Sequence, residues 1–135
     1  EAADLYDQFR ELGAEILSVS TDSAHSHQAW HQSSRRIGKI RYPMLADPAG
    51  KLCKAFGTYI EEEGVSLRAT FIVDPEGVVK SLEMNDDAIG RNTKEILRKL
   101  QALQQVGSDP ETLCPASWKP GEKVLRPKFD LLGDS

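Results

Sequence analysis

The feature that most constrains the fold is a pair of apolar runs joined by a tight turn. The runs Arg68-Ala-Thr-Phe-Ile-Val-Asp74 and Val78-Val-Lys-Ser-Leu-Glu-Met84 flank Pro75-Glu-Gly77. β-Branched and aromatic residues on either side of a short Pro- and Gly-containing turn predict an antiparallel hairpin. At least part of this chain must therefore form β-sheet.

The rest of the chain alternates between helical and strand-like patterns. Apolar residues recur at helical spacing in the first twelve residues and again after residue 93, where Ile96, Leu97, Leu100 and Leu103 share one face. These patterns predict one α/β domain of 135 residues. We expect helices over 1–12, 25–37, 51–56 and 93–106, and further strands over 14–20 and 42–46.

The composition changes after residue 106. Four of the seven prolines fall between Gly107 and Ser135, among charged and isolated apolar residues. This segment lacks a core-forming period, but it is too apolar to be simply disordered. We therefore predict a core over 1–106 and an extended tail over 107–135, which packs on its own domain or on a second subunit. The isolated apolar residues of the tail are Leu113, Trp118, Val124, Leu125, Phe129, Leu131 and Leu132.

Charge and cysteine content exclude several classes of protein. A net charge of −4 disfavours nucleic acid as a partner, because phosphate-binding surfaces need an excess of Lys and Arg. No apolar run approaches the roughly 18 residues of a membrane span, and no signal-peptide pattern opens the chain. Two cysteines are too few for a disulfide scaffold and lack zinc-motif spacing. We expect a cytoplasmic protein with no membrane and no nucleic-acid partner.

The two cysteines have different surroundings in the sequence. Cys114 lies in the proline-rich tail, away from the expected core elements, so that it is either a reactive thiol or an incidental exposed one. Cys53 lies on a short predicted helix among apolar neighbours, which favours a small packed side chain.

Two arginines and three histidines are further candidates. Arg68 opens the first hairpin strand and Arg91 precedes the last helix. Each is either a solvated surface group or a guanidinium that faces an anion, because strand ends in α/β sheets line ligand crevices. His25, His27 and His31 cluster on one helix, but no third ligand stands at motif spacing, which disfavours metal binding.

Several segments in order resemble one family. The chain is similar to the typical two-cysteine peroxiredoxins of the bacterial alkyl hydroperoxide reductase C type. This resemblance implies a thioredoxin-like fold and thiol-dependent reduction of hydrogen peroxide and alkyl hydroperoxides, with no cofactor and no metal. The segments that carry it are Ser18-Val-Ser-Thr-Asp22, His27-Gln-Ala-Trp30, Tyr42-Pro-Met-Leu-Ala-Asp-Pro-Ala-Gly50, Glu63-Gly64, Arg68-Ala-Thr-Phe-Ile-Val-Asp-Pro-Glu-Gly77, Ile89-Gly-Arg91 and Cys114-Pro-Ala-Ser-Trp118.

The resemblance assigns roles to three residues. Cys114 matches the resolving cysteine, which forms a disulfide with the partner subunit. Arg68 matches the arginine that holds the peroxidatic thiolate and orients the peroxide, and Arg91 matches a second arginine that supports this pocket. The implied partners are the peroxide substrate, a disulfide reductase of flavoprotein or thioredoxin type, and a second subunit in a homodimer that can assemble further into a decamer.

The family's peroxidatic cysteine has no match in these 135 residues. The resemblance places it about six residues before Glu1, with the pocket's Pro and Thr further upstream and the central strand also preceding it. We therefore expect the physiological protein to be longer at its N-terminus. Two alternatives are a non-catalytic thioredoxin-like binding or assembly module, and a thiol–disulfide exchange protein using Cys53 and Cys114, which the missing Cys-x-x-Cys disfavours.

Overall fold

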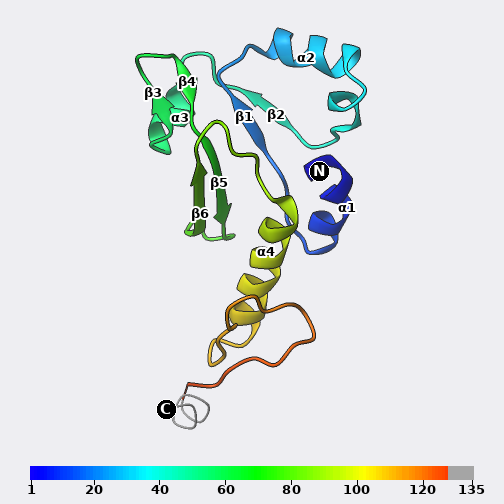
Figure 1. Cartoon of the computed structure of the whole chain (residues 1–135), viewed down its shortest axis with the longest axis vertical. Coiled ribbons are helices and arrows are strands. Elements are labelled where there is room, and N and C mark those ends of the chain that lie inside the picture. The colour runs from blue at the N-terminus through cyan, green and yellow to red at the C-terminus, as the bar shows by residue number, and fades with distance from the viewer. Residues whose placement is uncertain (128–135) are drawn as a thin grey trace. The chain divides into compact units, whose positions relative to one another are not determined.

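The chain alternates between helices and short strands, as the sequence predicts (Figure 1). The computed structural model describes residues 1–127. These residues group into two units, the first containing Glu1–Phe71 and Leu82–Arg91, the second Ile72–Ser81 and the chain from Asn92 onward. The predicted division after residue 106 does not coincide with this grouping and stays a prediction.

The first unit begins with helix α1 (Ala2–Glu11). Tyr6 and Phe9 are buried on one face of this helix, each with 4% of its surface exposed. Gly13 ends the helix at φ +75°, and the N–H groups of Gly13 and Ala14 donate to the carbonyl oxygens of Arg10 and Phe9. This bonding pattern requires a left-handed residue after the helix, which glycine adopts at little cost.

Two parallel strands and a second helix follow. Strands β1 (Ser18–Ser20) and β2 (Met44–Ala46) pair in parallel, with Ser18 opposite Met44. Helix α2 (Ala24–Ser33) is capped by the Ser23 hydroxyl, which accepts the N–H of Ser26. Both elements are shorter than expected: the strand over 14–20 is confirmed only at its end, and the helix stops at Ser33 before a separate turn, η1 (Ile37–Lys39).

Helix α3 (Lys51–Ala55) follows a turn that its own residues hold. The Asp47 carboxylate accepts the N–H groups of Leu52 (3.2 Å) and Cys53 (2.9 Å), which caps the helix. Gly50 has φ +70°, and a Cβ at this position would lie 2.4 Å from the Tyr59 ring. Glycine is therefore required here by both backbone conformation and space.

Two hairpins follow α3. Strands β3 (Tyr59–Ile60) and β4 (Val65–Ser66) form a short antiparallel pair around the acidic run 61–63, which the sequence did not predict. Strands β5 (Arg68–Val73) and β6 (Val79–Asn85) confirm the predicted hairpin. Its turn is held by the Asp74 carboxylate, which accepts the N–H groups of Glu76 and Val78.

The second unit contains helix α4 (Thr93–Ser108) and the segment after it. The Asn92 side chain accepts the N–H of Glu95 and caps the helix. Residues 109–127 lie against α4 rather than away from it: Thr112 and Trp118 are 1% and 4% exposed. The described part of the tail, residues 109–127, therefore packs on α4 of its own chain. The tail's expected apolar residues Phe129, Leu131 and Leu132 lie outside the described residues.

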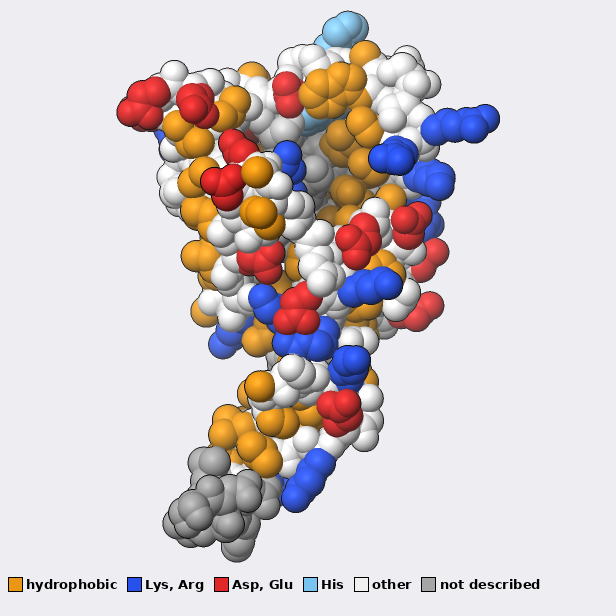
Figure 2. Space-filling view, viewed as in Figure 1, with side chains coloured by type: hydrophobic (Ala, Val, Ile, Leu, Met, Phe, Trp, Pro, Cys, Tyr) orange, Lys and Arg blue, Asp and Glu red, His pale blue; other side chains and the backbone are white. Residues whose placement is uncertain are grey.

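Apolar side chains are also visible on the surface among charged ones (Figure 2). Val73 at the end of β5 is 47% exposed, and Leu82 on the facing strand β6 is 56% exposed. Phe71 on β5 does make an apolar contact: its ring centroid lies 4.7 Å from that of Phe56. Within residues 1–127 we find no helix with the length and apolarity that crossing a membrane requires.

Candidate functional site

Arg68 lies at the first residue of β5, with its side chain exposed. Its Nε–H donates to the carbonyl oxygen of Asp87, 2.8 Å away, in the loop that follows β6. This bond orients the guanidinium through one nitrogen. Its two Nη amino groups, each a double donor, can therefore face a ligand.

Arg91 makes the return contact from the end of the same loop. Its Nε–H donates to the Thr70 hydroxyl (3.0 Å) and its Nη2 donates to the Ala69 carbonyl oxygen (3.1 Å). The two predicted arginines therefore connect the beginning of β5 with loop 86–91 in opposite directions. The structure places them in one region of the first unit.

Among the residues that the structure describes, no carboxylate compensates the charges of these two arginines. Within residues 1–127, Arg68 and Arg91 have neutral oxygens as hydrogen-bond partners and no carboxylate within ion-pair distance. Burial raises the pKa of Tyr42, and the positive charge of Arg91 partly offsets this rise. A guanidinium that is held by neutral atoms keeps its full charge for an anionic ligand.

Cys114 belongs to the second unit. Its side chain is half-buried, and its thiol donates to the carbonyl oxygen of Ala102 on α4, with Sγ and O 3.7 Å apart. The expectation that this cysteine stands away from the core elements is therefore wrong, because the tail returns along α4. Cys114 begins the turn Cys114-Pro-Ala-Ser-Trp118.

Cys53 has the structural role that its sequence context indicates. It is 5% exposed on α3, and its backbone N–H donates to the Asp47 carboxylate. Burial, followed by the neighbouring Asp47, raises the pKa of the Cys53 thiol. A raised pKa reduces the thiolate fraction at neutral pH, so Cys53 is poorly suited to nucleophilic attack.

Two of the three histidines, His27 and His31, have different hydrogen-bond partners. His27 is 6% exposed and hydrogen-bonds to the Ser20 hydroxyl through Nε2. His31 uses its Nε2 with the Ile40 carbonyl oxygen, 3.0 Å away. In the part of the chain that the structure describes, no group of three or more His, Cys, Asp or Glu residues is placed to hold a metal ion.

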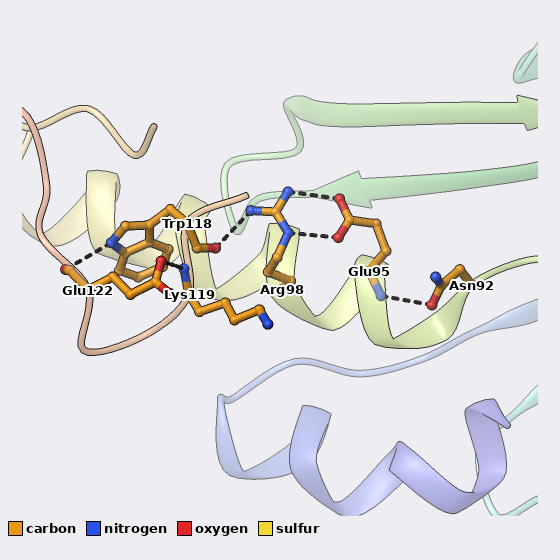
Figure 3. A network of polar contacts seen from close by, with 6 residues as sticks. All are labelled: Asn92, Glu95, Arg98, Trp118, Lys119 and Glu122. Atoms are coloured by element: carbon orange, nitrogen blue, oxygen red, sulfur yellow. Dashed lines mark hydrogen bonds and ion pairs between the residues drawn. The ribbon is translucent and has the colours of Figure 1, made fainter. Parts of the chain in front are cut away.

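A polar network around Arg98 was missed by sequence reasoning. Arg98 on α4 forms two hydrogen bonds with the Glu95 carboxylate, at 2.7 and 2.8 Å, and a third with the Trp118 carbonyl oxygen at 2.8 Å (Figure 3). The spacing of Glu95 and Arg98, three residues apart on a helix, predicts their pairing. No sequence signal indicates the Trp118 contact, because its acceptor is a backbone atom.

Comparison with known proteins gives the class of this chain. The model of the AhpC/TSA family matches residues 1–82. Alkyl hydroperoxide reductase C of Pseudomonas aeruginosa and that of Escherichia coli K12 are each 45% identical over 133 residues, which are 98% of this chain and 71% of theirs. The chain belongs to the AhpC/TSA family.

Solved structures agree with this assignment. Enterococcus faecalis AhpC superposes with a TM-score of 0.81 at 49% identity, over 84% of this chain and 68% of that one. A reduced 2-Cys peroxiredoxin of Plasmodium vivax gives a TM-score of 0.87 at 34% identity, over 93% of this chain and 65% of that one. The fold is therefore the thioredoxin-like fold of the peroxiredoxins, as the resemblance implied. Within its family the chain is a homologue of the AhpC peroxiredoxins, which are thiol peroxidases.

Proposed function

We propose that this chain acts in a thiol-dependent peroxidase that reduces hydrogen peroxide and alkyl hydroperoxides, with Cys114 as its resolving cysteine. The observation that carries the proposal is the pair Arg68 and Arg91, which join β5 to loop 86–91 through neutral oxygens and meet no carboxylate within residues 1–127. The similarity to alkyl hydroperoxide reductase C over 98% of the chain supports it.

The chemistry has two thiol steps. A peroxidatic thiolate attacks one oxygen of ROOH, and the O–O bond breaks with uptake of one proton, giving a sulfenic acid and ROH. The Cys114 thiol then attacks the sulfenic sulfur, forming a disulfide and releasing water. The peroxidatic thiol is not among the 135 residues, in which the two cysteines are Cys53 and Cys114. Cys53 does not suit that role, because it is buried and the pKa of its thiol is raised.

Arg68 and Arg91 would act on the first step. Negative charge develops on the leaving oxygen as the O–O bond breaks, and fixed donors aimed at that charge lower the barrier. Arg68 has both Nη groups available for this purpose, whereas Arg91 commits two nitrogens to Thr70 and Ala69. Arg68 is therefore the proposed direct contact, and Arg91 the group that holds the strand beside it.

The catalytic cycle also needs partners. We propose a homodimer in which Cys114 pairs with the peroxidatic cysteine of the other subunit, and a decamer as the larger assembly. The disulfide is returned to two thiols by a disulfide reductase of flavoprotein or thioredoxin type. Such a cycle suits the cytoplasm, where thiols are kept reduced.

The test uses the protein expressed from its natural gene, treated with one equivalent of hydrogen peroxide and analysed on non-reducing gels. We expect peroxide consumption and a covalent dimer that Cys114→Ser abolishes and Cys53→Ser retains. Cys53→Ser is the matched control, because it removes the same atom from a buried site. A protein that consumes no peroxide in the presence of a thiol reductant would refute the proposed activity. A dimer that survives Cys114→Ser but is lost in Cys53→Ser would refute the assignment of the resolving cysteine.

A further inference from the structure

The segment that carries Cys114 is a closed loop rather than a loose tail. Leu113 and Leu125 exchange two backbone hydrogen bonds, both 2.8 Å long. Next to this bridge, Arg126 forms an ion pair with Asp109, 2.8 Å apart, at the end of α4. Thr112, 1% exposed, donates its hydroxyl to the Asp109 carbonyl oxygen. These contacts tie both ends of the loop to the C-terminal end of α4.

The far end of the loop is anchored by Trp118. Its side chain is 4% exposed, and its indole N–H donates to the Glu122 carbonyl oxygen, 3.0 Å away (Figure 3). The Glu122 carboxylate accepts the backbone N–H of Lys119 at 2.9 Å. Four residues before this anchor, the Cys114 thiol lies against the Ala102 carbonyl oxygen. In this closed arrangement the Cys114 thiol is therefore engaged with α4.

Arg98 connects the anchor to the helix. Its Nη1 donates to the Trp118 carbonyl oxygen at 2.8 Å, and its Nε and Nη2 are held by the two oxygens of Glu95. Glu95 itself follows the cap of α4, where its N–H is bonded to the Asn92 side chain. Hydrogen bonds with Glu95 raise the pKa of Arg98, while burial opposes this effect.

A strained residue lies between the thiol and the anchor. Ser117 has φ +61°, and among residues 1–127 it is the non-glycine residue found in the left-handed region. The turn is closed by the bond from the Trp118 N–H to the Pro115 carbonyl oxygen, 3.1 Å long. The left-handed conformation is unfavourable for a non-glycine residue, so the turn persists only where surrounding contacts offset this cost.

We propose that Arg98 is a positioning residue for the resolving step: its bond to the Trp118 carbonyl oxygen latches the Cys114 loop onto α4 and sets how often Cys114 is exposed. This proposal rests on the proposed function of Cys114. The strain at Ser117 acts against the latch, so the loop opens without unfolding the helix. The attack on the sulfenic sulfur follows only from the open state.

The first experiment measures the latch without peroxide. In the protein expressed from its natural gene, thiols are labelled with a chromogenic disulfide reagent, and each cysteine is followed by peptide mapping. We expect Arg98→Gln to accelerate labelling of Cys114 about ten-fold, which corresponds to about 1.4 kcal/mol and is of the size expected for one hydrogen bond to a charged group. Labelling of Cys53 in the same sample should stay unchanged, because it reports wider unfolding.

The matched control is Arg41→Gln. Arg41 forms an exposed ion pair with Asp7 at the same distance, 2.8 Å, in the first unit. Arg41→Gln changes the net charge equally, and we expect Cys114 labelling within two-fold of wild type, because an exposed ion pair contributes little to stability. Equal acceleration in the two variants would show a general charge effect and overturn the proposal.

A second set of variants separates positioning from general stability. Arg98→Lys keeps the charge on a single nitrogen but loses the paired contact with Glu95, so the labelling rate should lie between those of wild type and Arg98→Gln. Ser117→Asn should slow labelling, because asparagine tolerates the left-handed conformation better than serine. If Arg98→Gln does not fold, Glu95→Gln answers the same question with the arginine in place.

The outcomes are decisive in each case. Wild-type labelling of Cys114 in Arg98→Gln or Glu95→Gln, or equal acceleration at Cys53 and Cys114, would overturn the latch. Failure of the proposed function leaves these rates unaffected, because no peroxide takes part in them. If both proposals hold, Arg98→Gln should also form the peroxide-driven disulfide faster, and Ser117→Asn more slowly.

Discussion

The arginines near β5 and the arginine on α4 have opposite surroundings. Arg68 and Arg91 are exposed and donate to neutral oxygens of the backbone and of Thr70. The Arg98 side chain is 22% exposed and is paired through two nitrogens with the Glu95 carboxylate. The first two keep their charge available, whereas the charge of the third is compensated within the helix.

This difference separates two uses of the same side chain. A guanidinium oriented by carbonyl oxygens is held in place without losing its attraction for an anion, so its removal should affect reaction rate more than folding. A guanidinium paired with a carboxylate has less charge to offer, and its remaining donor holds a peptide carbonyl. The predictions below test whether this division is correct.

The largest effect is expected at Arg68. Arg68→Lys keeps the positive charge but loses the planar set of donors, so the rate constant for reaction with hydrogen peroxide should fall about ten-fold or more. This follows if one charge-assisted hydrogen bond of about 1.5–3 kcal/mol belongs to the transition state. The measurement is stopped-flow kinetics on the protein expressed from its natural gene, with Arg41→Lys as control.

The thermal midpoint of Arg68→Lys should stay near that of wild type. The side chain is exposed, and its described protein contact is one bond to the Asp87 carbonyl oxygen, which a lysine can also make. Wild-type peroxide kinetics, or a variant that does not fold, would contradict the role given to Arg68 and return it to a surface group at a strand end.

A smaller effect is expected at Arg91. Arg91→Lys replaces two separate donor nitrogens, Nε and Nη2, by a single ammonium, so β5 is held less firmly beside Arg68. Lysine keeps the charge but gives up part of this bonding, a net loss of about 0.5–1.5 kcal/mol, the usual contribution of one hydrogen bond, so the peroxide rate constant should fall roughly two- to ten-fold. Thr70→Val removes one acceptor and should give the lower part of this range. A larger loss in Arg91→Lys than in Arg68→Lys would show that the two roles are reversed.

The same comparison shows what the sequence can and cannot predict. The β5–β6 hairpin and α4 were predicted because their signals are local: a Pro-Glu-Gly turn between β-branched runs, and apolar residues at helical spacing. Strands β3 and β4 were missed, because two-residue strands are too short to show a period. The end of helix α2 was predicted too late, because the sequence contains a recognisable cap at its start but no signal for its end.

The candidate site divides in a similar way. Arg68, Arg91 and Cys114 were found through motifs, and their roles stay predictions. The placement of Cys114 on α4 was missed, because it depends on the bridge between Leu113 and Leu125 and on the Trp118 carbonyl oxygen. These contacts are made to backbone atoms in segments without periodicity. Because every residue has such atoms, the amino-acid sequence does not indicate where the contacts form.

A buried carboxylate should affect stability without affecting rate. Asp47 is 8% exposed, and hydrogen bonds from the Cys53 and Leu52 backbone lower its pKa. Asp47→Ala removes the cap of α3 and should lower the free energy of unfolding by about 1 kcal/mol, measured by urea denaturation. Peroxide kinetics in native buffer should match wild type. An unchanged free energy of unfolding would show that the cap is not needed.

The smallest effect is expected from titration of Glu95. Its pKa is lowered, first by the hydrogen bonds from Arg98 and further by the charges of Arg98 and Lys99, while burial opposes this. Because the folded-state pKa is lowered, the ionised carboxylate stabilises the latch fully at pH values above the ordinary pKa of about 4.3. This stabilisation is lost as the pH falls through the lower pKa of the folded state. Cys114 labelling, followed with a pyridine disulfide that reacts in acid, should therefore accelerate relative to Cys53 as pH falls below about 4.3.

The size of this acceleration is limited by exposure of the pair. The Glu95 side chain is 35% exposed, and ion pairs with such access to solvent contribute about 0.2–1 kcal/mol, which is less than about five-fold in rate. Asp109 and Glu122 are further carboxylates of this segment, so the matched variant is Glu95→Gln, which leaves both in place. It should start with faster labelling at neutral pH and lose most of the acid acceleration. If Glu95→Gln shows the full acid response, the titrating group lies elsewhere in the loop, and Arg98 is held to α4 without help from the Glu95 charge.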